Sequence, residues 1–211
     1  MEYNEKQLSI INTAEKLFSV TGFDGTSVRD IAHAAAVNVA MISYYFGSKE
    51  KLMEAVFEQK TYKMRLKVEN LIQDDKMSNY QKVSVLIDDY VDKFLSQPQF
   101  HKLMLREQLD DKPGGVSGMI LELKKKNFAT IKKLIQEGQK AGEFRKHVDV
   151  ALMMATMVGT VSQMIISDRF YKETSNMEKM SGDEFNMYMK KKLSTHLKNL
   201  FKSILTNEAK H

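Results

Sequence analysis

Two short amphipathic helices around a tight turn are the feature that most constrains this chain, and they lie within residues 22–52. A first helix is predicted over residues 27–35, because Ser27 and Asp30 form a shortened capping box at its start and apolar residues recur on one side. After a turn at residues 36–38, a second helix of about two turns follows. This is helix-turn-helix geometry, in which the second helix enters a DNA major groove.

The second helix has two different faces. Its inward positions carry Met41, Ile42 and Phe46. The residues that are free to project are Val39, Ala40, Ser43, Tyr44 and Tyr45. For the two tyrosines the alternative to DNA contact is packing against the first helix, and we expect at least one of them to pack inward.

The residues that can contact DNA fall into three roles. Ser27, Tyr45 and Lys49 are placed to contact phosphates, which fix orientation without reading sequence. Arg29 is a long donor that can bind guanine O6 and N7 together. On the second helix, Val39 and Ala40 are expected to contact thymine methyl groups. Short polar contacts are expected from Asn38, Ser43 and Tyr44.

These motifs carry a family resemblance that covers roughly the first quarter of the chain. The runs are TSVRDIA, AVN, SYYF and SKEKL, preceded by the amphipathic stretch IINTAEKLFSVTGF. Together they resemble the TetR (tetracycline repressor) family of bacterial transcriptional regulators. One position departs from the family pattern, because Ala36 stands where the family usually has glycine. We expect a slightly less tight turn there.

Helical periodicity continues to the end of the chain, and strand-like alternation is absent. The fold class is therefore all-α, with about nine helices. They are expected at about 4–21, 27–35, 39–46, 48–71, 80–95, 99–109, 116–141, 148–170 and 182–205, with polar or glycine-bearing breaks such as the DDKPGG of residues 110–115. We expect a DNA-binding domain at residues 1–48, and the resemblance implies a helical ligand-binding and dimerisation domain at 49–211.

The composition of the chain limits how it can associate with membranes and with DNA. The chain has no cysteine and no run of about 18 apolar residues, so we expect a cytoplasmic protein with no membrane partner. Residues 1–60 hold 6 Lys and Arg against 8 Asp and Glu, so the net charge of +5 comes from the rest of the chain. DNA affinity must then depend on a few placed donors. The lysine clusters at 124–126 and 190–192 are interpreted as solvated helix faces.

A row of small residues along one face of the helix expected at 148–170 predicts a homodimer. Small residues recur there every four positions, at Ala151, Ala155 and Gly159, which lets another helix approach closely. The last helix would add Leu193, Leu197, Leu200 and Ile204. Such helix pairs can form a four-helix interface across a two-fold axis, as the resemblance implies. The alternative is ordinary core within one chain.

The resemblance also implies a small-molecule pocket in the second domain. Candidate lining residues are soft and apolar, and lie on separate predicted helices: Tyr90, Phe94, Met104, Met119, Phe128, Met153 and Met157. The alternative for each is a place in the core. We find no catalytic constellation, no cofactor motif and no metal-ligand spacing.

The sequence therefore favours a ligand-responsive regulator that binds a palindromic double-stranded DNA operator as a homodimer. A repressor released by a small apolar or amphipathic inducer is the preferred interpretation. An activator or a corepressor-dependent regulator of the same fold is the alternative, and a helical enzyme or carrier with an incidental helix pair is a third.

Overall fold

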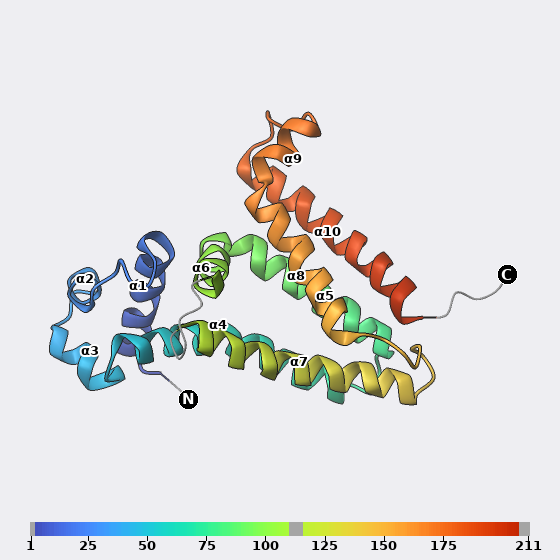
Figure 1. The fold of residues 1–211 in the computed structure, drawn as a ribbon, viewed down its shortest axis with the longest axis horizontal. Helices are drawn as coiled ribbons and strands as arrows, with labels where there is room; N and C mark the ends of the chain where they lie inside the picture. Colours follow the sequence, from blue (N-terminus) through green and yellow to red (C-terminus); the bar gives the residue numbers. More distant parts are fainter. Residues whose placement is uncertain (1–2, 110–115, 207–211) are drawn as a thin grey trace. The chain divides into compact units, whose positions relative to one another are not determined.

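The computed structural model describes residues 3–109 and 116–206, apart from the side chains of residues 63–65, and the break expected at 110–115 lies outside the described residues. The described chain is all-helical and forms ten helices (Figure 1). They are α1 (Glu5–Thr21), α2 (Val28–Ala34), α3 (Val39–Phe46), α4 (Lys49–Gln73), α5 (Asn79–Ser96), α6 (Pro98–Leu109), α7 (Val116–Lys140), α8 (Val150–Ile166), α9 (Asp168–Thr174) and α10 (Gly182–Leu205).

Local sequence explains why several helices begin where they do. A capping box, in which the N-cap side chain and the third helical residue satisfy each other's backbone amides, opens four helices, with the pairs Asn4/Gln7, Ser27/Asp30, Ser78/Gln81 and Ser181/Glu184. An N-cap of this kind is worth about 1 kcal/mol. The C-cap of α1 is Gly22 at φ +81°, a conformation that suits glycine.

One expected helix is divided. The segment predicted as a single helix at 148–170 breaks at Ser167, whose φ of −113° and ψ of 29° are not helical. The Ser167 amide still donates to the Gln163 carbonyl at 2.9 Å, so α8 keeps its helical bonding up to its C-cap, and α9 begins at the next residue. The count is therefore ten helices where about nine were expected. In the described part of the chain no single helix could span a membrane, and the α8 and α9 pair that passes on length and composition is bent by 76°.

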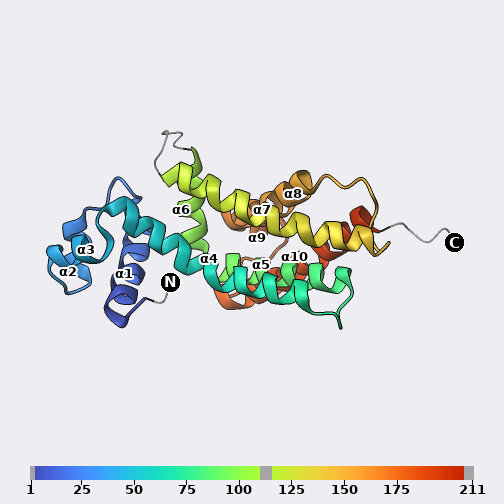
Figure 2. The same cartoon turned by 90° about the horizontal axis from the view of Figure 1, so that it is seen from below.

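The chain forms two compact units, and neither is one continuous segment. The first contains residues 1–65 and 99–124, and the second contains residues 66–98 and 125–211. The domain boundary expected at residue 48 stays a prediction. In the first unit, α6 and the start of α7 share one core with the N-terminal helices, through the buried residues Phe100, Leu103, Val116 and Ile120. The ribbon of α6 crosses that of α4 in Figure 2.

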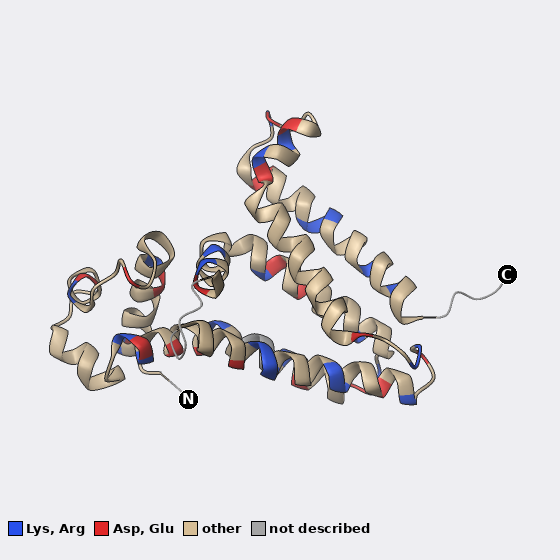
Figure 3. Cartoon of the chain, viewed as in Figure 1, with Lys and Arg blue, Asp and Glu red and all other residues tan. Residues whose placement is uncertain are grey.

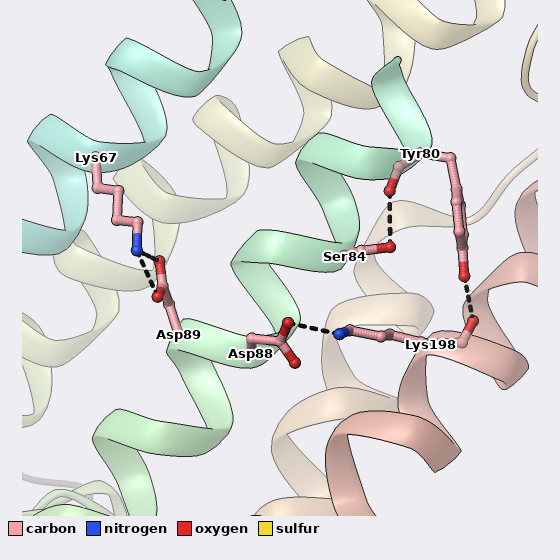
Figure 4. A network of polar contacts seen from close by, with 6 residues as sticks. All are labelled: Lys67, Tyr80, Ser84, Asp88, Asp89 and Lys198. Atoms are coloured by element: carbon pink, nitrogen blue, oxygen red, sulfur yellow. Dashed lines mark hydrogen bonds and ion pairs between the residues drawn. The ribbon is translucent and has the colours of Figure 1, made fainter. Parts of the chain in front are cut away.

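The second unit is organised around the contact of α5 with α10. Apolar residues from both helices are buried, including Val83 and Ile87 of α5 and Phe201 of α10. Polar bonds fix the alignment (Figure 4): the Tyr80 hydroxyl donates to the Lys198 carbonyl at 2.8 Å, and Lys198 Nζ lies 2.5 Å from an Asp88 carboxylate oxygen. These bonds tie the two helices together at positions more than 100 residues apart in the chain.

Candidate nucleic-acid interface and regulatory residues

The start of α2 is held by a tight local network. The Ser27 hydroxyl donates to the Asp30 carboxylate at 2.6 Å, and the Ser27 amide donates to the same oxygen at 2.9 Å. These two bonds, the side-chain bond first, hold the pKa of Asp30 below its usual value. Both donors of Ser27 are therefore occupied by Asp30. The predicted phosphate contact of Ser27 requires at least one of them to change partner.

The turn between α2 and α3 places an alanine in the left-handed region. Ala36 has φ +53°, and its amide donates to the His33 carbonyl at 3.1 Å. The next amide, of Val37, donates to Ala32 at 2.9 Å. The chain thus closes the turn with an alanine where glycine would adopt this conformation without steric cost.

Helix α3 presents a nearly uncharged surface. Its side chains include no Lys, Arg, Asp or Glu, as Figure 3 shows. Asn38 caps the helix by accepting the Ala40 amide at 2.9 Å, which leaves its side-chain NH₂ available. Ile42 is buried beneath the helix. The exposed side chains are Val39, Ala40, Ser43 and Tyr44, four of the five residues predicted to project, and the fifth, Tyr45, is half-buried.

The two tyrosines of α3 differ. Tyr44 is 84% exposed, whereas Tyr45 is half-buried and packs against the core of the first unit. Their ring centres lie 5.3 Å apart in an edge-to-face arrangement. Tyr45 is therefore the tyrosine that packs inward. The contacts of both with DNA stay predictions.

Lys49 takes part in the structure of the α1–α2 loop. Its Nζ donates to the carbonyl oxygens of Phe23 at 3.0 Å and Thr26 at 3.1 Å, and it lies 4.3 Å from the Phe23 ring centre. Because an ammonium has three donors, one remains for the predicted phosphate contact. Sequence reasoning did not identify this loop-holding role. Arg29 is exposed at the first turn of α2, close in sequence to the cap.

The predicted pocket residues are divided between the two units. Met104 and Met119 belong to the first unit, and the other five belong to the second. In the second unit Tyr90 is buried and stacks on Phe94 with ring centres 4.1 Å apart. Met153 of α8 is also buried, whereas Phe128 and Met157 are half-buried. These five residues are the ones that can contribute to a site in the second unit.

The Tyr90 hydroxyl is a polar atom inside this apolar unit. Within the described residues it is buried without a hydrogen-bond partner. Burial raises the pKa of Tyr90, so the hydroxyl stays protonated. A buried hydroxyl without a partner costs free energy, and a bound acceptor would remove that cost.

The predicted dimer residues are of two kinds. Ala151, Ala155 and Gly159 are exposed on α8, and a Cβ added at Gly159 would meet no atom within 4 Å. Leu193 and Leu197 of α10 are buried in their own chain, at 4% and 0% exposure, so they offer no surface to a partner. Leu200 and Ile204 are half-buried. The surface of α8 is thus the part of the predicted interface that the chain leaves open.

A shallow hollow of about 460 Å³ lies in the α7–α8 connection, away from the predicted pocket residues. Its lining consists of Gln139, Gly142, Phe144, Arg145, Lys146 and His147. In the ranges that the structure describes, no three His, Asp or Glu side chains come together as a metal site.

Comparison with known families matches both parts of the chain. Residues 10–56 match the family model described as bacterial regulatory proteins, tetR family. Residues 80–188 match the model described as tetracyclin repressor-like, C-terminal domain.

Individual relatives agree with these matches. The HTH-type transcriptional repressor NicS of Pseudomonas putida is 29% identical over 153 residues, which are 71% of this chain and 72% of NicS. The probable HTH-type transcriptional regulator YttP of Bacillus subtilis is 62% identical over 45 residues, 21% of this chain and 22% of YttP. The crystal structure of the regulator FadR from Bacillus subtilis with stearoyl-CoA has a TM-score of 0.68 at 20% identity, covering 93% of this chain and 97% of that one.

Proposed function

Because this chain belongs to the TetR family of bacterial transcriptional regulators, we propose that it is a repressor, released from a palindromic operator when a small apolar or amphipathic effector binds. Its relatives are transcriptional regulators, so the chain is a regulator and not an enzyme. The repressor role is favoured by the likeness to NicS, which is itself described as a repressor. We place this activity in the cytoplasm, where the operator is.

The observation that carries the DNA-reading part is the exposed, uncharged surface of α3. Val39, Ala40, Ser43 and Tyr44 project from a helix whose other side is anchored by Ile42. A helix of this kind in the major groove reads few base pairs, so selectivity requires two copies. A homodimer on a two-fold symmetric operator supplies the second copy.

The dimer proposal rests on α8. Beside the small residues of its stripe, α8 exposes large apolar side chains, with Leu152 at 65% and Ile166 at 59% exposure. Exposed apolar surface on a single helix is costly in water and typical of a surface that pairs. The open space in front of Gly159 allows a second helix to approach its backbone.

The effector proposal rests on Tyr90. An apolar ligand portion would contact Phe94 and Met153, and a carbonyl or carboxylate oxygen would accept a hydrogen bond from the protonated Tyr90 hydroxyl. An amphipathic molecule has both parts. The FadR structure of similar fold contains one such molecule, stearoyl-CoA.

The test combines DNA selection with a search for the effector. A palindrome is selected from a random duplex pool, and small molecules that copurify with the protein are identified by native mass spectrometry and added back to the protein–DNA complex. We expect the molecule to weaken DNA binding. In Tyr90→Phe a higher concentration of the molecule should be needed to release the DNA. A molecule that strengthens binding would instead establish the corepressor alternative.

A further inference from the structure

The backbone of Phe23 is held at both its N–H and its carbonyl by residues outside the α1–α2 loop. Its N–H donates to the Glu107 carboxylate of α6 at 3.2 Å. The carbonyl oxygen of the same residue accepts from Lys49 Nζ, at the first residue of α4, at 3.0 Å. One loop residue therefore connects α6 to the start of α4.

The neighbouring residue, Gly22, makes the contact with α6 closer. A Cβ built at Gly22 would lie 2.8 Å from the guanidinium carbon of Arg106, and Gly22 has φ +81°. The conformation disfavours a side chain at this position, whereas the guanidinium is the far end of a flexible side chain and can move aside. The loop is thus fitted against two consecutive residues of α6.

The same loop determines where α2 begins. Lys49 Nζ also donates to the Thr26 carbonyl at 3.1 Å, and Thr26 directly precedes Ser27, the N-cap of α2. Thr26 is buried, and its hydroxyl donates to the Gly22 carbonyl at 2.8 Å. A displacement of the Phe23 backbone would therefore move the N-cap of α2 and the side chain of Lys49, the first residue of α4.

Helix α6 is placed to transmit such a displacement. It packs in the core of the first unit, where Phe100 meets Phe57 of α4 with ring centres 5.6 Å apart. It also follows α5 in the chain without a spacer, since Gln97 caps α5 and Pro98 begins α6. One end of α6 is thus covalently joined to α5, and its other end carries Glu107.

We propose that Glu107 and Lys49 are positioning residues for DNA reading, which hold the backbone of Phe23 between them so that the state of α6 reaches α2 and α4 through this one residue. This route is separate from the continuous backbone of α4. The idea that an effector acts through this route rests on the proposed function. The positioning of Phe23 by Glu107 and Lys49 does not, because it is a property of the free protein and of its DNA complex.

The test compares Glu107→Ala with Glu107→Gln in the full-length protein. The glutamine keeps an oxygen acceptor for the Phe23 N–H, whereas the alanine removes it. We expect amide hydrogen exchange at Phe23, followed by NMR, to accelerate roughly two- to tenfold in Glu107→Ala, the effect of losing one net hydrogen bond, and to change less in Glu107→Gln. Affinity for the selected palindrome should fall about threefold or more in the alanine variant and be largely restored in the glutamine variant.

The sign of the DNA effect separates positioning from electrostatics. Both variants remove one negative charge, which by itself would strengthen binding to a polyanion equally in the two. A charge-matched control is Glu54→Gln, which removes an exposed carboxylate of α4 that pairs with Lys51 and does not touch the loop. Unchanged exchange at Phe23 in Glu107→Ala, or equal and strengthened DNA binding in both Glu107 variants, would overturn the proposal. If no effector exists, the proposed function is wrong, but hydrogen exchange at Phe23 and DNA affinity still test the roles of Glu107 and Lys49.

Discussion

Lys49 lies with its ammonium nitrogen 4.3 Å from the centre of the Phe23 ring and donates a hydrogen bond to the carbonyl oxygen of the same residue. This double contact joins the first residue of α4 to the loop before α2. It makes Lys49 a structural residue of the reader as well as a candidate phosphate donor.

Replacing Lys49 with alanine separates the two roles. Losing the loop contacts should weaken binding to every DNA sequence, because α2 is no longer held at its start. A direct phosphate contact should in addition lower the salt slope of binding by up to ~1 per site. Titrations over a range of salt concentrations measure both quantities. Lys51→Ala is the matched control, since Lys51 is exposed and its ammonium pairs with Glu54 of the same helix. Reduced affinity with an unchanged slope would assign Lys49 to the loop alone.

Replacing Ala36 with glycine should stabilise the protein. An L-residue in the left-handed region costs about 1–2 kcal/mol, and Ala36 has φ +53°. Glycine removes this strain but costs about 0.5–1 kcal/mol of additional chain entropy on folding, so the net gain is between zero and about 1.5 kcal/mol. Urea unfolding measures the difference. Ala34→Gly, at an exposed helical position of α2, should have the opposite sign. A loss of stability in Ala36→Gly would contradict the assignment of strain to this turn.

The local parts of this site could be predicted from the sequence because capping is a short-range interaction. Ser27 with Asp30, and Gly22 after α1, are separated from their partners by only a few residues. The inward and outward faces of α3 follow from helical periodicity in the same way, with Ile42 buried and Tyr44 exposed.

The long-range parts could not be predicted, because an apolar or charged residue does not specify its partner. Glu107 lies 84 residues from Phe23, and no spacing rule connects a carboxylate on one helix to a particular loop amide. Leu193 and Leu197 illustrate the same limit. Their periodicity correctly indicates a buried face, but they pack inside their own chain, whereas a dimer interface was expected. The break at Ser167 was missed because serine is tolerated within helices.

Gly159→Leu tests the dimer surface on α8. Because a Cβ added at Gly159 meets no atom of the described residues within 4 Å, leucine should leave the fold of the protomer intact. In the dimer it would hold the two α8 helices apart, so sedimentation should show more monomer and band shifts should show weaker operator binding. Gly118→Leu is the control, because Gly118 of α7 also faces open space. A Gly159→Leu protein that stays dimeric and binds DNA normally would exclude this stripe from the interface.

The burial of His101 should make the stability of the protein depend on pH. This buried residue of α6 has its pKa lowered from 6.5 to about 4 by burial. As the pH falls below about 6.5, the unfolded chain binds a proton at this position before the folded chain does. The free energy of unfolding should therefore decrease between pH 6.5 and 4, and the decrease should be smaller in His101→Gln. Urea unfolding of both proteins at several pH values measures this difference, and parallel curves would show that His101 makes no contribution.

Substituting uracil for thymine in the operator tests how α3 reads sequence. The exposed Val39 and Ala40 have no polar side-chain atoms, and α3 carries no charged donor, so much of the selectivity should come from contacts with thymine methyl groups and from DNA shape. Uracil deletes the methyl group and little else, so binding should weaken at one or two positions of each half-site. Arg29→Ala is the complementary variant and should cost about 1–3 kcal/mol per half-site on cognate DNA, with relaxed preference at one position. If every thymine can be replaced without loss, the hydrogen-bonding residues Arg29, Asn38 and Tyr44 carry the readout instead. Equal losses on cognate and scrambled DNA would show that Arg29 contacts only the backbone.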